Sequence, residues 1–399
     1  MNGKTLEDAR SLFIVSKDYG ELGMVVSFLR DQKLADRAAV LLPENLYSLN
    51  KNVRPGSTYE YKTLENIQTV LNNHNPDLVF LFSGYLFSND KLLSPKSVER
   101  LVQLLRARGC RVITSDPLVG LASRITASDI DVEMFLWGIP FLQRCILRLV
   151  FLRKNKSIAS VRSLDDVVHL YATSSPESNP EDRMKRFSYF NPKIVRATID
   201  VFTTPAGDSP KSGMLLRQMK WLFVLSSTDL RIQQGIFGVH EFERLLIRML
   251  KRTSSIGKYP TLIAPATIIK SLSRALSNTV ELISLRPFSE FESRILGAEY
   301  VFYWNAFSFS MLPRLANTLP VFFFDRGHLA RVVKPYYRAA LTCHFSGSEP
   351  NYLDQRDELD PGALAKFAEK QKSWARSIVK HWQSSPTPDQ LVSELLNCG

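Results

Sequence analysis

Residues 299–325 read EYVFYWNAFSFSMLPRLANTLPVFFFD, in which two apolar runs flank a polar turn and a helix-length segment. The runs 300–304 and 321–324 are rich in aromatic and β-branched residues, as buried parallel strands tend to be. Three polar residues stand where the intervening helix is expected to begin: Asn305, Ser308 and Ser310. A helix start offers free backbone N–H groups and a positive dipole end, which together bind phosphate. The stretch therefore predicts a strand–helix–strand unit with a seat for phosphate.

The rest of the chain repeats this alternation of short apolar runs and helix-length segments. Its 399 residues exceed what one ordinary core holds, and 45% hydrophobic residues suffice for two cores. Strands are expected at 11–16, 38–43, 77–83, 111–115 and 166–172 in the first half, and at 221–226, 261–266, 280–285, 300–304 and 321–325 in the second. Short apolar strands separated by helices form right-handed parallel βαβ units. We therefore predict an α/β protein with two Rossmann-like, doubly wound parallel-sheet domains that face a central cleft.

Composition also suggests the domain boundaries. Residues 203–213 read TTPAGDSPKSG, and their Pro, Gly and Ser content is typical of a linker. Residues 1–202 would then form the first domain, and residues 214–360 the second. The polar stretch 173–193 is interpreted as a surface loop. Residues 361–399 carry two helical patterns, which we expect to pack back toward the first domain.

Charge and cysteine content restrict the partners and the compartment. The net charge of +12 and the pI near 9.5 favour an anionic partner: a nucleotide-linked substrate, a membrane surface or nucleic acid. Aromatic and basic residues are not interleaved in one stretch, so nucleic acid is not the expected partner. The cysteines lie far apart without a CxxC pair, which argues against a zinc site or a disulfide scaffold: Cys110, Cys145, Cys343 and Cys398. A polar N-terminus and the lack of any stretch of about 18 apolar residues predict a cytoplasmic chain without a membrane span.

The second half resembles the nucleotide-sugar domain of GT-B glycosyltransferases. The most specific part is VELISLRPFSEFESRILGAEYVFYW at 280–304, followed by NTLPVFFFD at 317–325, and the layout extends over nearly the whole chain. The resemblance implies the GT-B fold and a nucleotide-sugar substrate, with no separate cofactor. It places Arg286 near the nucleotide base. It places the polar turn of the opening stretch, with Asn305, Ser308 and Ser310, near the pyrophosphate.

Two positions depart from the commonest form of this motif. Many GT-B enzymes carry a glutamate seven residues before the motif's proline, where this chain has Pro313, and a glycine two residues before it, where this chain has Thr318. The paired-glutamate pattern of many retaining enzymes is therefore absent. That absence favours an inverting mechanism or a divergent family, and it leaves lost activity open. Pro313 itself fits the first turn of a helix, where proline is tolerated.

Acidic residues that follow strands of the first domain are the candidate catalytic bases. Asp18 and Glu21 lie in the turn after the first expected strand, and Asp116 directly follows the fourth. An inverting transfer needs a base that deprotonates the acceptor hydroxyl. The alternative for Asp18 is a helix N-cap, with Glu21 at the capping-box spacing of three residues. The alternative for Asp116 is ordinary Asp-Pro turn chemistry.

Polar residues that follow strands of the second domain are the candidate donor contacts. Ser226 and Thr228 follow its first expected strand, with Arg231 shortly after, and hydroxyls in such places often only cap helices. Asp325 and Arg326 follow its last expected strand, where a carboxylate can orient a sugar hydroxyl and a guanidinium can pair with phosphate. His328, two residues on, can act as acid or base, and the alternative for the segment is a turn with an incidental histidine. The chain has no HExxH, P-loop or GxGxxG motif, so no metal site is predicted.

Residues 133–156 read EMFLWGIPFLQRCILRLVFLRKNK and combine helical apolar spacing with uninterrupted positive charge after residue 133. Such a helix can lie on an anionic membrane, where each basic residue contributes about 1 kcal/mol. The alternative is a helix that faces the core, with its arginines reaching outward.

Together these patterns predict a glycosyltransferase that moves a sugar from a nucleotide-sugar donor to a glycan or lipid-linked acceptor, with inversion and without a metal ion. Such an enzyme would serve polysaccharide biosynthesis, with a peripheral contact at the inner face of the membrane. Two alternatives stay open. A nucleotide-sugar epimerase would form its product without an acceptor, and a catalytically inactive GT-B-like scaffold is favoured by Pro313 and Thr318.

Overall fold

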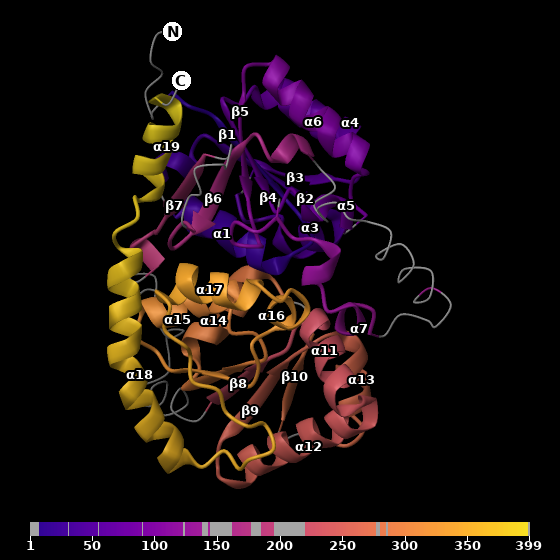
Figure 1. Cartoon of the computed structure of the whole chain (residues 1–399), viewed down its shortest axis with the longest axis vertical. Coiled ribbons are helices and arrows are strands. Elements are labelled where there is room, and N and C mark those ends of the chain that lie inside the picture. Colours follow the sequence, from indigo (N-terminus) through magenta and orange to yellow (C-terminus); the bar gives the residue numbers. More distant parts are fainter. Residues whose placement is uncertain are drawn as a thin grey trace.

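Two separate parallel sheets organise the molecule (Figure 1). The computed structural model describes residues 8–30, 32–54, 56–89, 91–122, 124–137, 143, 162–176, 185–194, 220–276, 280–284 and 286–397. Every strand pair in both sheets is parallel. Parallel neighbours need crossover helices, and these helices cover both faces of each sheet.

The first domain holds a seven-stranded sheet in the order β3-β2-β1-β4-β5-β6-β7. Its strands are β1 Ser11–Val15, β2 Ala38–Pro43, β3 Thr58–Tyr61, β4 Leu78–Phe82, β5 Arg111–Ser115, β6 Val168–Ala172 and β7 Arg186–Tyr189. Its helices are α1 Tyr19–Leu29, α2 Gln32–Ala35, α3 Glu44–Asn50, α4 Leu64–His74, α5 Leu86–Asn89, α6 Pro95–Ala107 and α7 Val132–Phe135, with the 3-10 turns η1 Ala127–Asp129 and η2 Arg162–Leu164. The winding reverses between β1 and β4, which is the usual place for a ligand in such a sheet.

The second domain holds a five-stranded sheet in the order β10-β9-β8-β11-β12. Its strands are β8 Lys220–Val224, β9 Tyr259–Ile263, β10 Glu281–Ile283, β11 Tyr300–Tyr303 and β12 Val321–Phe323. Its helices are α11 Ser227–Phe237, α12 Val239–Ser255, α13 Ala266–Leu272, α14 Phe288–Gly297, α15 Leu312–Ala316, α16 His328–Val332 and α17 Tyr336–Phe345, with the 3-10 turn η3 Phe309–Met311. The winding reverses here between β8 and β11, so both domains are doubly wound.

The two-domain α/β architecture expected from the sequence is confirmed, and two details are corrected. The stretch 173–193, interpreted as a loop, contains strand β7, and β3 was not expected at all. Both are outermost strands of their sheet, with a weak apolar pattern. The linker 203–213 lies outside the described residues. So does nearly all of the basic stretch, at 138–142 and 144–156, while the beginning of that stretch lies in α7.

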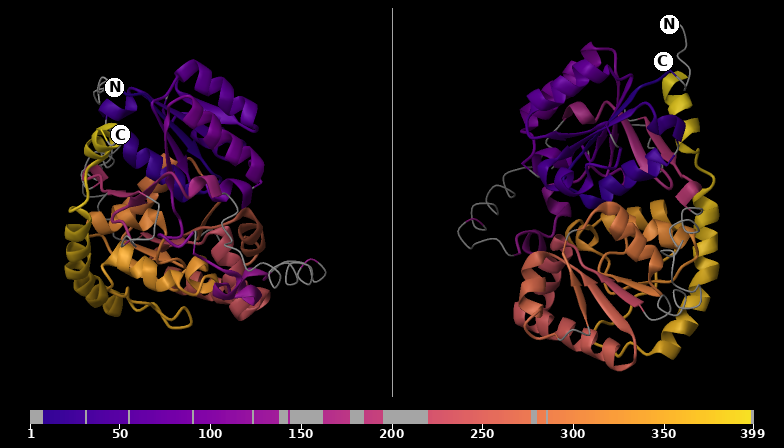
Figure 2. Two further views of the ribbon diagram at one scale, coloured as in Figure 1. Left: turned by 45° about the horizontal axis from the view of Figure 1, so that its top comes forward. Right: turned by 180° about the vertical axis from the view of Figure 1, so that it is seen from behind.

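Two terminal helices, α18 Pro361–Trp382 and α19 Pro388–Asn397, run along one side of both domains (Figure 2). α18 packs on the second domain, where Gln371 hydrogen bonds to both the N–H and the C=O of Val321 at 2.9 and 2.6 Å. α19 places Leu391, Val392 and Leu395 in the core of the first domain. No helix in the described part of the chain is long and apolar enough to cross a membrane.

Apolar contacts join the two domains where their sheets face each other. The ring of Phe309 in η3 packs on α1, where an added Cβ on Gly23 would lie 2.8 Å from it. Tyr19 of α1 contacts the rings of Phe288 and Phe291 in α14 at 5.7 and 5.5 Å. A backbone hydrogen bond also joins the domains: the Asp131 N–H of the first domain donates to the Val332 carbonyl of α16 at 2.7 Å. The carboxyl ends of the two sheets are therefore held close together.

Candidate functional site

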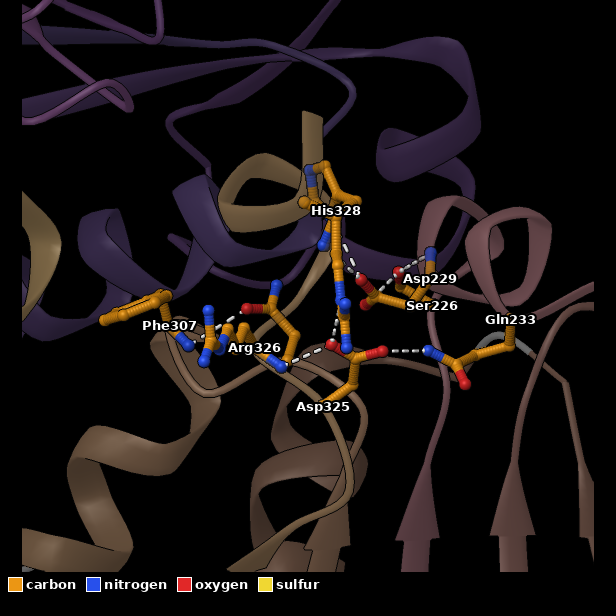
Figure 3. Close-up of polar contacts among 9 residues, drawn as sticks. Ser226, Asp229, Gln233, Phe307, Asp325, Arg326 and His328 are labelled. Atoms are coloured by element: carbon orange, nitrogen blue, oxygen red, sulfur yellow. Dashed lines mark hydrogen bonds and ion pairs between the residues drawn. The ribbon is translucent and has the colours of Figure 1, made fainter. Parts of the chain in front are cut away.

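Polar side chains gather where β8, β11 and β12 end at the face of the second sheet that meets the first domain (Figure 3). They come from the loops after these strands and from the starts of α11 and α16. We call this group the carboxyl-edge cluster, and it comprises Ser226, Asp229, Gln233, Asn305, Asp325, Arg326, His328 and Arg331. Because β8 and β11 flank the point where the winding reverses, the cluster occupies the expected ligand position of a doubly wound sheet.

Asp229 and His328 form an acid–histidine dyad in this cluster. Ser226 caps α11: its Oγ accepts the Asp229 N–H at 3.0 Å and donates to Asp229 Oδ2 at 2.6 Å. Asp229 Oδ1 accepts the His328 N–H at 3.0 Å and lies 3.1 Å from His328 Nδ1. With Nδ1 donating to the carboxylate, Nε2 is left to accept or donate a proton. Asp229 is 3% exposed and the His328 side chain 27%, so the carboxylate is sealed while the ring reaches solvent.

Asp325 is locked by a chain of buried hydrogen bonds. Its Oδ1 accepts the N–H of Arg326 at 2.5 Å and Nε of Arg331 at 2.8 Å, while its Oδ2 accepts Nε2 of Gln233. The Gln233 carbonyl oxygen then accepts Nε2 of Gln355 at 2.8 Å, and Gln355 accepts Trp304 Nε1 at 2.8 Å. Each carboxylate oxygen of Asp325 thus has a partner, so this geometry makes it a residue that positions others. Its predicted contact with a sugar hydroxyl stays a prediction.

Arg326 is one of two exposed arginines of the cluster, with Arg331. Its guanidinium lies over the ring of Tyr337 with 4.3 Å to the ring centroid, in a cation–π contact. Its backbone pairs with Asn305 across an isolated antiparallel bridge. Gly327, with φ of 93°, follows it, and a Cβ there would collide with the Asn305 side chain. The close approach of the two loops after β11 and β12 therefore requires a glycine at this position.

The polar turn from the opening stretch lies beside the cluster, in a different form from the one expected. Ser308 and Ser310 share a hydrogen bond of 2.9 Å, and Asn305 Oδ1 accepts the Phe307 N–H at 2.9 Å. The expected helix over 310–317 is the 3-10 turn η3 followed by α15 of five residues. So short a helix carries little dipole, so the structure gives little support to the phosphate seat expected at its start. Pro313 stands in the first turn of α15, as expected.

The remaining predicted donor contacts are spread over the second domain. Arg286 is half-exposed, with its carbonyl accepting the Tyr19 hydroxyl, and the Phe288 N–H donates to Asn50 Oδ1 at 2.7 Å. The segment expected near the base is thus pressed against the first domain. Thr228 is half-buried in the first turn of α11. Arg231 is half-buried on the same helix, where desolvation lowers its pKa and its Nε has no hydrogen-bond partner among the described residues.

The predicted bases of the first domain have three different environments. Asp18 is exposed and caps α1, with Oδ1 accepting the Gly20 N–H at 2.6 Å. Glu21 does not complete a capping box; it is buried, and its carboxylate accepts the hydroxyls of Ser83 and, at 2.9 Å, Ser115. Burial, with the nearby charge of Asp18, raises the pKa of Glu21 to about 7 against the pull of the two hydroxyls.

Asp116 has the environment of a turn residue. Its oxygens accept the N–H groups of Leu118 and Gly120 at 2.8 and 2.7 Å, and the Tyr171 hydroxyl at 3.1 Å. It is 5% exposed, so the carboxylate shapes the loop after β5. The structure therefore brings most second-domain candidates together at one edge but does not unite Asp18, Glu21 and Asp116 in one exposed group.

Sequence reasoning missed some members of the cluster. Asp229 was the most accessible to prediction, because Ser226 three residues earlier gives the Ser-x-x-Asp spacing of an N-terminal cap. Arg331 carries no local signal, and neither does Gln355, which supports the cluster through Gln233, since both roles arise from contacts across the fold. Within the described residues, no group of three or more His, Cys, Asp or Glu side chains is placed to hold a metal ion.

Comparisons with known proteins support the fold and nothing finer. No protein-family profile and no curated protein sequence matches the chain. Among solved structures, it is similar to the spinosyn rhamnosyltransferase SpnG complexed with thymidine diphosphate, at 12% identity and a TM-score of 0.50, over 97% of this chain and 100% of that one. It is similar to a putative UDP-N-acetylglucosamine 2-epimerase from Listeria monocytogenes at 11% identity and a TM-score of 0.50, over 97% and 96%.

A third similar structure is an α-glucosyltransferase in complex with UDP and a 13-mer DNA, at 9% identity and a TM-score of 0.50, over 97% of this chain and 99% of that one. The likeness spans both domains in each case. The chain therefore has the GT-B fold, and the resemblance noted in the sequence is confirmed at the level of the fold.

Proposed function

We propose that this protein binds a nucleotide sugar at the carboxyl-edge cluster and transfers the sugar to an acceptor held by the first domain. One observation carries the proposal. The Asp229–His328 dyad and the exposed guanidinium of Arg326 come from the segments after β8 and β12, on either side of β11, beside the winding reversal of the second sheet in a GT-B fold. Fold alone does not define chemistry, whereas these side chains supply groups that can bind phosphate and transfer a proton.

The leaving group of such a transfer is a nucleoside diphosphate, whose developing charge needs positive partners. In this proposal Arg326 pairs with phosphate oxygens, and His328 donates from Nε2 while Asp229 holds its ring. Guanidinium and imidazolium groups would then do what other enzymes assign to a metal ion, so we propose transfer without one. The polar turn after β11, with Ser308 and Ser310, lies beside the same position.

The acceptor side requires a base that can touch the acceptor hydroxyl. Among the three predicted acids, Asp18 is the exposed one and lies at the carboxyl end of β1. We therefore assign the base to Asp18 and a supporting role to Glu21 beneath it. Inversion follows if Asp18 activates a direct attack. The net charge of +12 suits an anionic glycan or a lipid-linked acceptor at the inner face of a membrane, as in polysaccharide biosynthesis.

A thermal-shift and calorimetry panel of nucleoside diphosphates tests donor binding. One of them should stabilise the protein, by about 2.7 kcal/mol at a hundredfold excess over its Kd. Arg326→Ala and His328→Ala should weaken that binding about tenfold or more, because each removes a charged hydrogen bond. Lys96→Ala on the remote helix α6 should not. If none of the diphosphates binds, the proposal is wrong; an epimeric nucleotide sugar formed without an acceptor would contradict the transfer step.

A second candidate function is a non-catalytic GT-B scaffold, and one observation favours it. The segment expected near the nucleotide base is closed against the first domain through Tyr19, Phe288 and Phe309. A scaffold would bind none of the diphosphates and would keep this contact. In the proposed enzyme, by contrast, nucleotide binding would separate Tyr19 from α14, which a change in hydrogen exchange at α1 would report.

A further inference from the structure

A basic stripe covers the outer face of helix α12. The stripe consists of Arg244, Arg248, Lys251 and Arg252, all exposed and spaced so that they share one side of the helix. The two acids of α12 are engaged: Glu241 pairs with Arg244 at 2.6 Å, and Glu243 accepts the Ser271 hydroxyl at 2.9 Å. The face therefore presents a row of four cations about 12 Å long, in which Arg244 is paired with Glu241 and Arg252 with Glu358, while Arg248 and Lys251 stand between them.

Exposed apolar side chains flank this stripe at both ends. Of the five large hydrophobic residues that are exposed in the described part of the chain, four lie here. Ile236 and Val239, at 40% and 45% exposure, stand where α11 passes into α12, and Ile256 and Tyr259, at 42% and 52%, follow its C-terminus. Single exposed apolar residues need no explanation, but four at the two ends of one cationic helix do.

Helix α12 and an adjoining cavity lie at one end of the molecule. The helix lies across the end of the second domain that is remote from the first domain (Figure 1). At the C-terminal half of α12, a cavity of about 330 Å³ opens toward residues 355–361, lined by Arg248, Arg252 and Arg356. Three acids also line this cavity and mark the border of the basic face: Asp357, Glu358, which is paired with Arg252 at 2.9 Å, and Asp360, which caps α18.

We propose that this α12 face is a docking surface for an anionic phospholipid membrane. Charge complementarity carries the choice of partner, because a row of cations flanked by aliphatic and tyrosine side chains fits phosphate headgroups over an acyl boundary. The surface is distinct from the basic stretch 133–156, and the proposal does not depend on the proposed transferase activity. Docking here would hold the whole molecule by its second domain.

Flotation with vesicles of phosphatidylcholine, with and without phosphatidylglycerol, tests this surface. The full-length protein should float with the anionic vesicles and dissociate as salt rises. Arg248→Glu with Lys251→Glu should lower partitioning by roughly 30-fold or more, since each lost basic contact weakens it about fivefold. Ile256→Ser with Tyr259→Ser should lower partitioning about tenfold on vesicles at every salt concentration. All four positions are exposed, so unchanged thermal unfolding should accompany these losses.

The matched control is Lys96→Glu with Arg100→Glu on α6, which makes the same change in net charge at exposed positions of the first domain. This control should change partitioning no more than about threefold. An equal effect of both pairs would overturn the proposal in favour of diffuse attraction. It would also be overturned if the protein ignores phosphatidylglycerol, in which case an acidic protein becomes the kind of partner for this face. Nucleoside diphosphate binding should be unchanged in the α12 variants.

Discussion

Glu21 is a buried carboxylate whose charge the fold tolerates at a cost. Its pKa rises from 4.5 to about 7, so the native state binds the proton more tightly than the unfolded chain does. The resulting stabilisation is complete below pH 4.5 and is lost as the pH rises through 7. The two serine hydroxyls hold the ionised form without fully replacing its hydration.

Glu21→Gln should therefore gain stability relative to the wild type as the pH rises. Between pH 4.5 and about pH 8, the difference in free energy of unfolding should move in favour of the glutamine variant by about 3 kcal/mol. Urea unfolding followed by circular dichroism across this range measures it. Glu394→Gln, an exposed change on α19, is the control and should show no such trend. Parallel pH curves for wild type and Glu21→Gln would contradict the buried charge.

Thr318 occupies a backbone conformation that suits glycine. Its φ is 52°, and a β-branched residue in the left-handed region costs about 1–2 kcal/mol. Replacing threonine by glycine removes this cost. Glycine, however, loses more backbone entropy on folding, which offsets about 0.5–1 kcal/mol of the gain. Thr318→Gly should thus raise the free energy of unfolding by about 0.5–1 kcal/mol. Thr318 stands where the GT-B motif commonly has a glycine. The side chain differs, but the backbone keeps the positive φ that favours glycine.

The same substitution inside a helix provides the control for Thr318. Thr342 is exposed in α17 and has helical dihedrals, so Thr342→Gly should lower the free energy of unfolding by about 0.5 kcal/mol. Chemical denaturation of both variants gives the comparison. A loss of stability in Thr318→Gly as large as that in Thr342→Gly would show that the left-handed strain at Thr318 is not released.

At the scale of elements, two buried glutamines tie helices to the second sheet in different ways. Gln371 of α18 satisfies the backbone of the outermost strand β12. Gln355 instead joins Trp304 at the end of β11 to Gln233 of α11 and so, through Gln233, supports Asp325. Both glutamines hydrogen bond to buried polar groups, yet only Gln355 is connected by hydrogen bonds to the carboxyl-edge cluster.

Replacing each glutamine by leucine separates stability from site geometry. Gln355→Leu and Gln371→Leu should each cost about 2–3 kcal/mol, since each leaves two buried polar groups unpaired. Gln355→Leu should also weaken nucleoside diphosphate binding, because it frees Gln233 and loosens Asp325. Gln371→Leu should not change that affinity. Equal affinities in the two folded variants would show that the hydrogen-bond chain does not position the cluster.

Elements also show why the sequence predicted some strands and missed others. The central strands are continuous apolar runs, fully buried on both faces, and β1, β4 and β11 were all recognised. The outermost strands β3 and β7 have half-exposed residues and few aliphatic ones. At these two outermost positions the strand has one neighbour and more solvent, so its apolar signal is weak, whereas β12 is also outermost but fully buried and was recognised.

At the scale of the whole molecule, site residues meet through contacts that no local pattern encodes. Ser83 and Ser115 reach Glu21 from 62 and 94 residues away, and Asp229 meets His328 across 99. The resemblance could place residues after the right strands, because carboxyl ends of parallel strands share one edge. It could not show that the Asp116 carboxylate would hydrogen bond within its own loop, because those bonds depend on Tyr171 and on the turn geometry.

The contact between the domains contains an ionisable group with the opposite dependence on pH. His344 of α17 is half-buried beside Phe307, and its Nδ1 lies 3.3 Å from Thr173 Oγ1 of the first domain. Burial lowers the pKa of His344 from 6.5 to about 4. A depressed native pKa gives stability that is present above pH 6.5 and is lost as the pH falls toward 4.

His344 and Glu21 should therefore compensate each other in the wild type, whose free energy of unfolding should change little between pH 6.5 and about pH 4.5. In Glu21→Gln the effect of His344 should no longer be compensated. The free energy of unfolding of this variant should therefore fall by about 3 kcal/mol as the pH drops from 6.5 to 4. Glu21→Gln with His344→Gln should remove this fall. Urea unfolding monitored by tryptophan fluorescence measures all three proteins. If the double variant loses as much stability on acidification as Glu21→Gln alone, the acid sensitivity lies elsewhere than in the domain contact.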